Sequence, residues 1–214
     1  MVALVLLSGG KSYYAAAMFG PFMAAGAIGV DGWLERGRQR LRGAAFVTAA
    51  AVSGLLIVLI TLPVLPPPTL ARTPISELYG ETAEQVGWPE LVESVQDAVD
   101  TMSPADREKA IVFTANYGEA SALELLGEDL PPVFSGHNGY GYWGPPPEDT
   151  ISIILVGHWA PETMRWAFGT CELAGRVDNG IDLDNQEQGA GVWVCRDRPT
   201  DTWEQSWPRL QHLD

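Results

Sequence analysis

Residues 44–65, AAFVTAAAVSGLLIVLITLPVL, decide the fold of this chain. The stretch holds twenty-two residues without a charge and runs directly into three prolines. An α-helix needs ~20 apolar residues to cross the hydrocarbon core of a bilayer. We therefore predict a transmembrane helix at 44–65, with a membrane region over residues 1–69 and an extramembrane domain over residues 70–214.

A second uncharged run precedes it, at residues 12–30, SYYAAAMFGPFMAAGAIGV. Lys11, Tyr13 and Tyr14 at its start are typical of an anchor at the membrane interface, where aromatic rings and a long amine sit well. The run is rich in glycine and alanine, which let helices approach closely. We predict a second span at 12–30 that packs with further transmembrane helices; the alternative is a buried helix of a soluble protein.

Residues 31–43, DGWLERGRQRLRG, separate the two runs and contain four arginines. Loops rich in arginine stay on the cytoplasmic side of a membrane. Both spans then have this loop at their cytoplasmic ends. The segment from Pro66 onward therefore lies on the outer side of the membrane. In a bacterium this predicts a multi-pass protein of the inner (plasma) membrane with an extracytoplasmic domain.

The first seven residues, MVALVLL, are apolar but too few to span a bilayer, and no basic residue precedes them as in a signal peptide. We expect them to be the end of a helix whose beginning is missing. On this interpretation, the chain is the C-terminal part of a larger protein.

Charge is distributed unevenly along the chain, whose net charge is −14. Residues 1–69 carry five basic and two acidic side chains, whereas the remainder carries eight basic and twenty-five acidic ones. So acidic a domain is repelled by phosphate backbones, which argues against nucleic acid as a partner.

The pattern after residue 70 predicts a small α/β domain. Apolar runs rich in β-branched residues alternate with stretches whose apolar residues recur at helical spacing. This alternation favours a mixed sheet covered by helices, in three layers. We predict strands at 110–115, 133–135, 150–156, 172–177 and 191–196, and helices at 90–102, 118–126 and 161–168, with a short helix capped by Ser103.

Polar residues follow the strand predicted at 110–115. In open α/β sheets, ligands gather at the carboxyl ends of strands, beside helix N-termini. Asn116, Tyr117 and Glu119 are therefore candidate ligand-binding residues. The alternative is ordinary turn and cap chemistry, and the turn lacks the glycines of a phosphate loop.

The segment 136–147, GHNGYGYWGPPP, reads as a loop that combines an imidazole, an amide and three aromatic rings. Such a set suits stacking on a sugar or packing against a lipid headgroup, although aromatic loops also cap cores. His137, Asn138, Tyr142 and Trp143 are the candidates here. His137 qualifies as an acid or base only if a carboxylate orients it.

Cys171 and Cys195 are the two cysteines of the chain, and each lies at the end of a predicted strand. Antiparallel neighbours would place them opposite each other, close enough for a disulfide. An outside location permits this bridge, while two buried free thiols remain the alternative.

Metal and catalytic signatures are weak. Residues 178–187 are rich in oxygen ligands that suit calcium, yet their spacing does not match an EF-hand loop, and Asx-rich turns are usually only turns. No G-x-S-x-G elbow, H-E-x-x-H helix, C-x-x-C pair or Walker loop occurs. We predict no metal and no cofactor.

Four segments together carry a family resemblance. They are GGKSYYAAAMFGPFMAAGAI (9–28), NYGEASALELLG (116–127), SGHNGYGYWGPP (135–146) and GRVDNGIDLDNQEQGAGVWVCR (175–196). They resemble the C-terminal portion of bacterial polytopic glycosyltransferases of the GT-C type, relatives of the dolichyl-phosphate-mannose protein mannosyltransferases and of the aminoarabinose lipid A transferases.

The resemblance implies a membrane enzyme that transfers a sugar from a polyprenyl-phosphate donor to an acceptor. In that family the catalytic carboxylates lie in the first extracytoplasmic loop, and no residue of this chain matches them. The chain is then expected to be inactive alone, and its partners are membrane lipid, the donor held by the missing N-terminal part, and further helices. Lys11 is the one position that would hold the lipid phosphate. The alternative is a two-span anchored module that binds a glycan or a protein.

Overall fold

The computed structural model describes residues 18–199 and 202–213. The chain divides into two compact units, residues 1–58 and 59–214, and each is described by itself. Residues 1–7, Lys11, Tyr13 and Tyr14 lie outside the described part, so the predictions made for them stay predictions.

Two helices make up the described part of the first unit, α2 (Phe19–Glu35) and most of α3 (Gln39–Thr61). Among the residues that the structure describes, α3 is the one helix long and apolar enough to cross a bilayer. Helix α2 has seventeen residues and includes Asp31 and Glu35, and the start of the span predicted at 12–30 lies outside the described residues. One candidate membrane helix is therefore present.

The arginine-rich segment is shorter as a loop than we predicted. Because α2 continues to Glu35 and α3 begins at Gln39, only residues 36–38 lie between the helices. Arg42 folds back across this turn: its Nη1 donates to the Trp33 carbonyl at 2.6 Å and its guanidinium lies 5.1 Å from the centre of the Trp33 ring. These contacts tie the two helix ends together.

The second unit is built on a mixed sheet of five strands in the order β2-β1-β3-β5-β4. Strands β2, β1 and β3 are parallel, whereas β5 runs antiparallel to both β3 and β4. The prediction of a mixed sheet is confirmed, with all five strands near their predicted positions. Their bounds are β1 (Ala110–Thr114), β2 (Val133–Ser135), β3 (Ser152–Gly157), β4 (Thr170–Arg176) and β5 (Gly191–Arg196).

The predicted helices of the domain are also present. Ser103 caps α7 by accepting the N–H of Asp106, as its sequence position indicates. The helix predicted at 161–168 is a short α-turn, α9, continued by a π-type turn, η4. The bounds are α6 (Trp88–Asp100), α7 (Pro104–Glu108), α8 (Tyr117–Leu126), α9 (Pro161–Thr163) and η4 (Met164–Phe168).

The remaining short helices were not predicted. Four of them lie in stretches that read as linker or loop, and the fifth, α10, contains a proline. They are α4 (Pro67–Leu70), α5 (Ile75–Leu78), η2 (Gly80–Gln85), η3 (Asn138–Trp143) and α10 (Trp203–Leu210).

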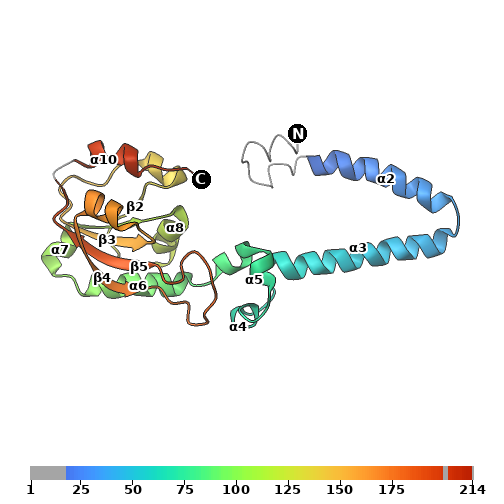
Figure 1. Cartoon of the computed structure of the whole chain (residues 1–214), viewed down its shortest axis with the longest axis horizontal. Helices are drawn as coiled ribbons and strands as arrows, with labels where there is room; N and C mark the ends of the chain where they lie inside the picture. Colours follow the sequence, from blue (N-terminus) through green and yellow to red (C-terminus); the bar gives the residue numbers. More distant parts are fainter. Residues whose placement is uncertain (1–17, 200–201, 214) are drawn as a thin grey trace. The chain divides into compact units, whose positions relative to one another are not determined.

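Two apolar cores lie on opposite faces of the sheet, because side chains alternate along each strand. Helices α6 and α8 cover one face, where Leu91 and Leu123 pack with Val112 of β1. Helix α10 and η4 cover the other face, where Trp203 and Phe168 surround Phe113, the next residue of β1. Figure 1 shows α10 on one side of the strands and α6 on the other. The three-layer prediction is confirmed for this domain.

Cys171 of β4 and Cys195 of β5 form a disulfide. The two residues are direct partners in the antiparallel ladder, with their Cα atoms 4.0 Å apart. Of the two alternatives left by the sequence, the bridge is the one that the structure has.

Candidate functional site

Three parallel strands end at one edge of the sheet, and residues that follow two of them, β1 and β2, form the candidate site. After β1 the chain passes through α8 to β2 on one side, whereas β3 pairs with β1 on its other side. The topological switch point, where α/β sheets bind ligands, therefore lies between β1 and β3, whereas the candidate residues follow β1 and β2. Asn116 follows β1, and His137 and Asn138 follow β2. The structure therefore brings the two predicted groups of residues to one edge.

Asn116 and Glu119 form a capping box at the start of α8. The Asn116 Oδ1 accepts the Glu119 N–H at 2.8 Å. In return, Glu119 Oε2 accepts the N–H groups of Ala115 at 2.9 Å and Asn116 at 3.1 Å. Helix capping, the alternative to ligand binding for these residues, is therefore present. It fixes the turn that carries Tyr117.

The Glu119 carboxyl is fully buried behind this turn. Burial raises its pKa to about 8, with a smaller contribution from the Glu187 carboxylate; the N–H groups of Asn116 and Ala115 oppose the shift. Gly157, which ends β3 at a φ of +116°, leaves the space for it, because a Cβ there would lie 3.0 and 3.1 Å from the two carboxyl oxygens. Glu119 is thus a neutral acid at pH 7.

Glu187 is a second buried acid at this place, and its side chain comes from the 178–190 segment. The residue is 2% exposed, and its Oε2 has no hydrogen-bond partner within the described part of the chain. Burial, with a smaller contribution from the neighbouring Glu84, raises its pKa to about 7, and the Asn116 amide opposes the shift. Sequence reasoning placed Glu187 only among oxygen-rich turn residues, and no local pattern links it to Glu119.

The 178–190 segment itself is held by turn chemistry. Asn179 Oδ1 accepts the N–H groups of Ile181 and Leu183, and its amide nitrogen donates to the Leu183 carbonyl. Asn185 binds the Ala83 and Val86 carbonyls through its amide. Within residues 18–199 and 202–213, no three His, Cys, Asp or Glu side chains are placed to hold a metal ion.

A row of three rings crosses the same edge. His137 is 5% exposed, and its Nδ1 accepts the Tyr117 N–H at 3.3 Å. Its ring centre lies 5.0 Å from that of Tyr117 and 4.6 Å from that of His212, with which it is stacked. Asn138 approaches the remaining ring nitrogen at 2.9 Å. His137 is thus held in place by its surroundings, and His212 is a neighbour that the sequence pattern did not indicate.

Exposed aromatic side chains lie next to this row, on η3. The side chains of Tyr142 and Trp143 are 78% and 71% exposed, so they do not cap the core. Tyr140 joins η3 to α8: its hydroxyl donates to Glu124 Oε2 at 2.8 Å and lies 3.2 Å from Ser121 Oγ. The Trp143 ring packs on Tyr140 at 4.4 Å.

We call this surface the aromatic edge. It consists of Tyr117, His137, Tyr140, Tyr142 and Trp143. Exposed ring faces beside hydroxyl and amide groups are the usual components of a site for a partly apolar, hydroxylated ligand.

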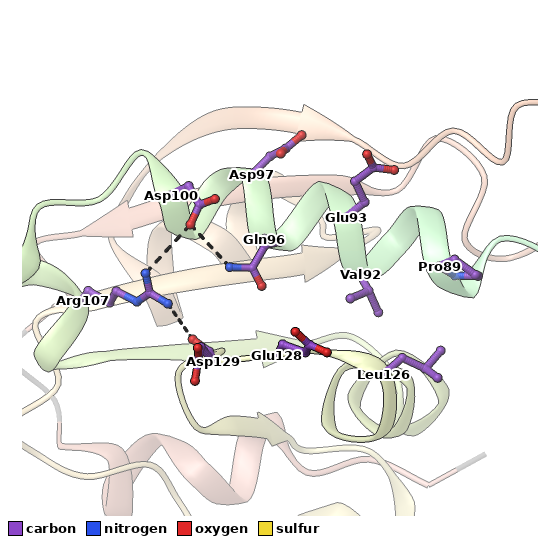
Figure 2. Close-up of a pocket in the computed structure, with 10 residues that line it drawn as sticks. All are labelled: Pro89, Val92, Glu93, Gln96, Asp97, Asp100, Arg107, Leu126, Glu128 and Asp129. Atoms are coloured by element: carbon purple, nitrogen blue, oxygen red, sulfur yellow. Dashed lines mark hydrogen bonds and ion pairs between the residues drawn. The ribbon is translucent and has the colours of Figure 1, made fainter.

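A separate groove of about 670 Å³ lies between α6 and the segments around α7 and the end of α8. Figure 2 shows Arg107 between Asp100 and Asp129, with its Nη1 3.9 Å from the Asp100 carboxylate and its Nη2 donating to the Asp129 carbonyl at 2.7 Å. The groove is acidic and contains none of the residues predicted to bind a ligand. Its carboxylates are those of Glu93, Asp97, Asp100, Glu128 and Asp129.

No family model, no curated protein and no solved structure matches the chain.

Proposed function

We propose that this chain acts in a membrane glycosyltransferase that uses a polyprenyl-phosphate-linked sugar, and that its α/β domain binds the glycan at the aromatic edge. What supports the proposal is where the segments with the family resemblance meet. Tyr140 and His137 belong to the segment 135–146, and Ser121 and Tyr117 to the segment 116–127. The Tyr140 hydroxyl contacts Ser121, and the His137 ring packs on Tyr117. Glu187 of 175–196 lies beside Glu119.

The chemistry of the edge suits a sugar. A pyranose ring has an apolar face that stacks on an aromatic ring, and hydroxyls at its rim that need hydrogen-bond partners. Tyr142 and Trp143 offer exposed rings, and Tyr140, Ser121 and Asn138 offer polar groups beside them. Aromatic side chains also lose little entropy on binding, because they have few rotatable bonds.

The proposed location is the extracytoplasmic side of a bacterial inner membrane. Helix α3 provides an apolar segment of sufficient length, and the arginines before it favour a cytoplasmic start. A disulfide persists in an oxidising compartment, so the Cys171–Cys195 bridge supports an outside location for the domain. The second span predicted at 12–30 is part of this proposal.

Catalysis is assigned elsewhere in the proposed enzyme. Glu119 and Glu187, the two carboxyls with strongly raised pKa at the edge, are buried, and Glu119 is engaged in the helix cap. Because neither is presented to a ligand, the chain itself is proposed to bind rather than to react. The same observation favours our second candidate, an anchored glycan- or protein-binding module without transferase activity.

Glycan binding by the full-length chain in detergent micelles tests the proposal. We expect oligosaccharides to bind, and the double variant Tyr142→Ala, Trp143→Ala to lose at least about tenfold in affinity, because stacking on an aromatic ring contributes on the order of 1 kcal/mol or more. Tyr79→Ala removes a partly exposed tyrosine that is not part of the aromatic edge and serves as the control. Equal affinity in the double variant and in the control would refute the site. Because this chain is expected to be inactive alone, transferase activity is measured in membranes that carry it together with the proposed N-terminal part. Activity there supports the enzyme, and no activity supports the module.

A further inference from the structure

The charges around the aromatic edge limit what it can bind. Between Lys109 and Arg165 the sequence has no lysine or arginine, and this interval contains β1, α8, β2, η3 and β3. These segments of the edge therefore lack a lysine or arginine, and so does the 178–190 segment; of the C-terminal residues 202–213, Arg209 is the basic one. The interval between Lys109 and Arg165 carries seven acids: Glu119, Glu124, Glu128, Asp129, Glu148, Asp149 and Glu162.

Three basic side chains of neighbouring elements lie away from the aromatic edge. Arg107 and Lys109 precede β1, and Arg196 ends β5 next to the amino end of β3, so these three lie toward the opposite edge of the sheet. Arg107 pairs with Asp100, Lys109 with Asp149 and Arg196 with Asp106.

Three further arginines, Arg176, Arg198 and Arg209, contact other groups of the domain. Arg176 lies on β4, four strand positions from β2 and so roughly 19 Å away across the sheet, and it donates to the Gly189 carbonyl. Arg198 stacks on Trp203 near the start of α10, and the guanidinium of Arg209 lies 4.1 Å from the centre of the Trp166 ring.

The N-terminus of α8 would otherwise be the natural place for an anion at this edge. Three of the amides there already have partners inside the protein. The Asn116 N–H donates to Glu119, the Tyr117 N–H to His137, and the Glu119 N–H to Asn116. These three groups are therefore not available to a phosphate or a carboxylate.

From these placements we infer that the aromatic edge takes uncharged sugar units and rejects sugars that carry phosphate or carboxylate. The inference rests on the proposed glycan binding and narrows its ligand class. Within the proposed enzyme, the edge then holds the acceptor glycan rather than the donor, because the donor carries its phosphate next to the sugar. The donor phosphate must bind elsewhere, at cationic groups.

Three monosaccharide probes of one ring type test the inference on the full-length chain in micelles: methyl glucoside, glucuronate and glucose 1-phosphate. A matched set with mannose or galactose follows if glucose does not bind. We expect the uncharged sugar to bind about tenfold more tightly than either anion at low salt, with the difference shrinking as salt rises to about 0.5 M. Glu124→Gln removes one nearby charge and should bring the anions closer to the uncharged sugar.

Anions that bind as tightly as the uncharged sugar, or more tightly, would overturn the inference while leaving glycan binding intact. A different result addresses the proposed function itself. If no member of any set binds, and Tyr142→Ala, Trp143→Ala behaves as the unmodified chain with longer oligosaccharides too, both the glycan site and the inference drawn from it fail.

Discussion

Asn116 and Glu119 cap each other at the start of α8, with the Asn116 side chain accepting the Glu119 N–H at 2.8 Å and the Glu119 carboxyl accepting the Asn116 N–H at 3.1 Å. This exchange sets the backbone between β1 and α8, and therefore the position of Tyr117. The turn that we interpret as part of a binding surface is therefore also held by reciprocal hydrogen bonds.

Removing the Glu119 side chain should destabilise the domain. Glu119→Ala leaves the Asn116 N–H without its acceptor and the Ala115 N–H with the Val156 carbonyl alone, which costs about 1–3 kcal/mol in the free energy of unfolding. Glu119→Gln keeps an acceptor oxygen of the same shape and should cost far less at pH 7, where Glu119 is already neutral. Denaturant unfolding of both variants checks this, and equal losses in the two would contradict the assigned role.

The buried acids also predict how stability depends on pH. The folded-state pKa values of Glu119 and Glu187 are raised to about 8 and about 7 from 4.5. Between about pH 4.5 and pH 8 the folded chain binds more protons than the unfolded chain. The free energy of unfolding therefore falls as pH rises through this range. We expect a loss of at least about 1 kcal/mol between pH 5 and pH 8.

The double variant Glu119→Gln, Glu187→Gln is the control for this pH dependence. The many surface carboxylates repel each other in both proteins, so they contribute similarly to the two pH profiles. The slope should become distinctly shallower in the double variant. A slope of the same size would show that these two groups do not cause it.

Loss of the disulfide should destabilise the domain by about 3 kcal/mol, because the bridge closes a loop between residues separated by 24 positions. Unfolding of Cys171→Ser, Cys195→Ser against the unmodified chain measures the effect. Mass spectrometry under non-reducing conditions should find no free thiol in the native protein. Two free thiols there would remove the bridge and, with it, one support for an outside location.

Topology is a further prediction of the proposal. A reporter fused after Asp214 should behave as extracytoplasmic, because the arginines before α3 favour the cytoplasm. A second reporter inserted at Gly37, between the two helices, is the matched control and should behave as cytoplasmic. The opposite pair of results would reverse the orientation and place the aromatic edge on the wrong side for a lipid-linked donor.

Much of the α/β fold could be predicted from the sequence because its strands are continuous apolar runs. Residues 110–114 form a fully buried strand, and such a strand has a local signature that needs no knowledge of its neighbours. The same holds for α6, where the residues at helical spacing are the buried ones. Patterns of this kind depend on a few consecutive residues alone.

Helix α10 had signals that were missed. Trp203, Trp207 and Leu210 are buried at helical spacing, and Thr202 with Gln205 forms a capping box. Pro208 inside the segment argues against a helix, because proline removes a backbone donor. Tertiary packing against the aromatic core around Phe113 outweighs that cost.

The chemistry of the candidate site was only partly predictable. The sequence singled out Asn116 and Glu119 because they follow a predicted strand, and His137 because it lies in an aromatic loop. It did not indicate that Glu187 would lie beside Glu119, or that His212 would stack on His137, because these contacts join distant segments. A pKa raised by burial is likewise a property of the assembled fold, not of the local sequence.

The most direct test of glycan binding at the aromatic edge is a map of the residues that sense the sugar. The full-length chain, isotope-labelled in micelles, is titrated with an uncharged oligosaccharide and its amide and aromatic NMR signals are followed. We predict the largest shifts at Tyr117, Ser121, Tyr142 and Trp143, with no change at Glu93 and Asp97 in the acidic groove. Shifts confined to that groove, or none at the aromatic edge at saturating sugar, would contradict the account.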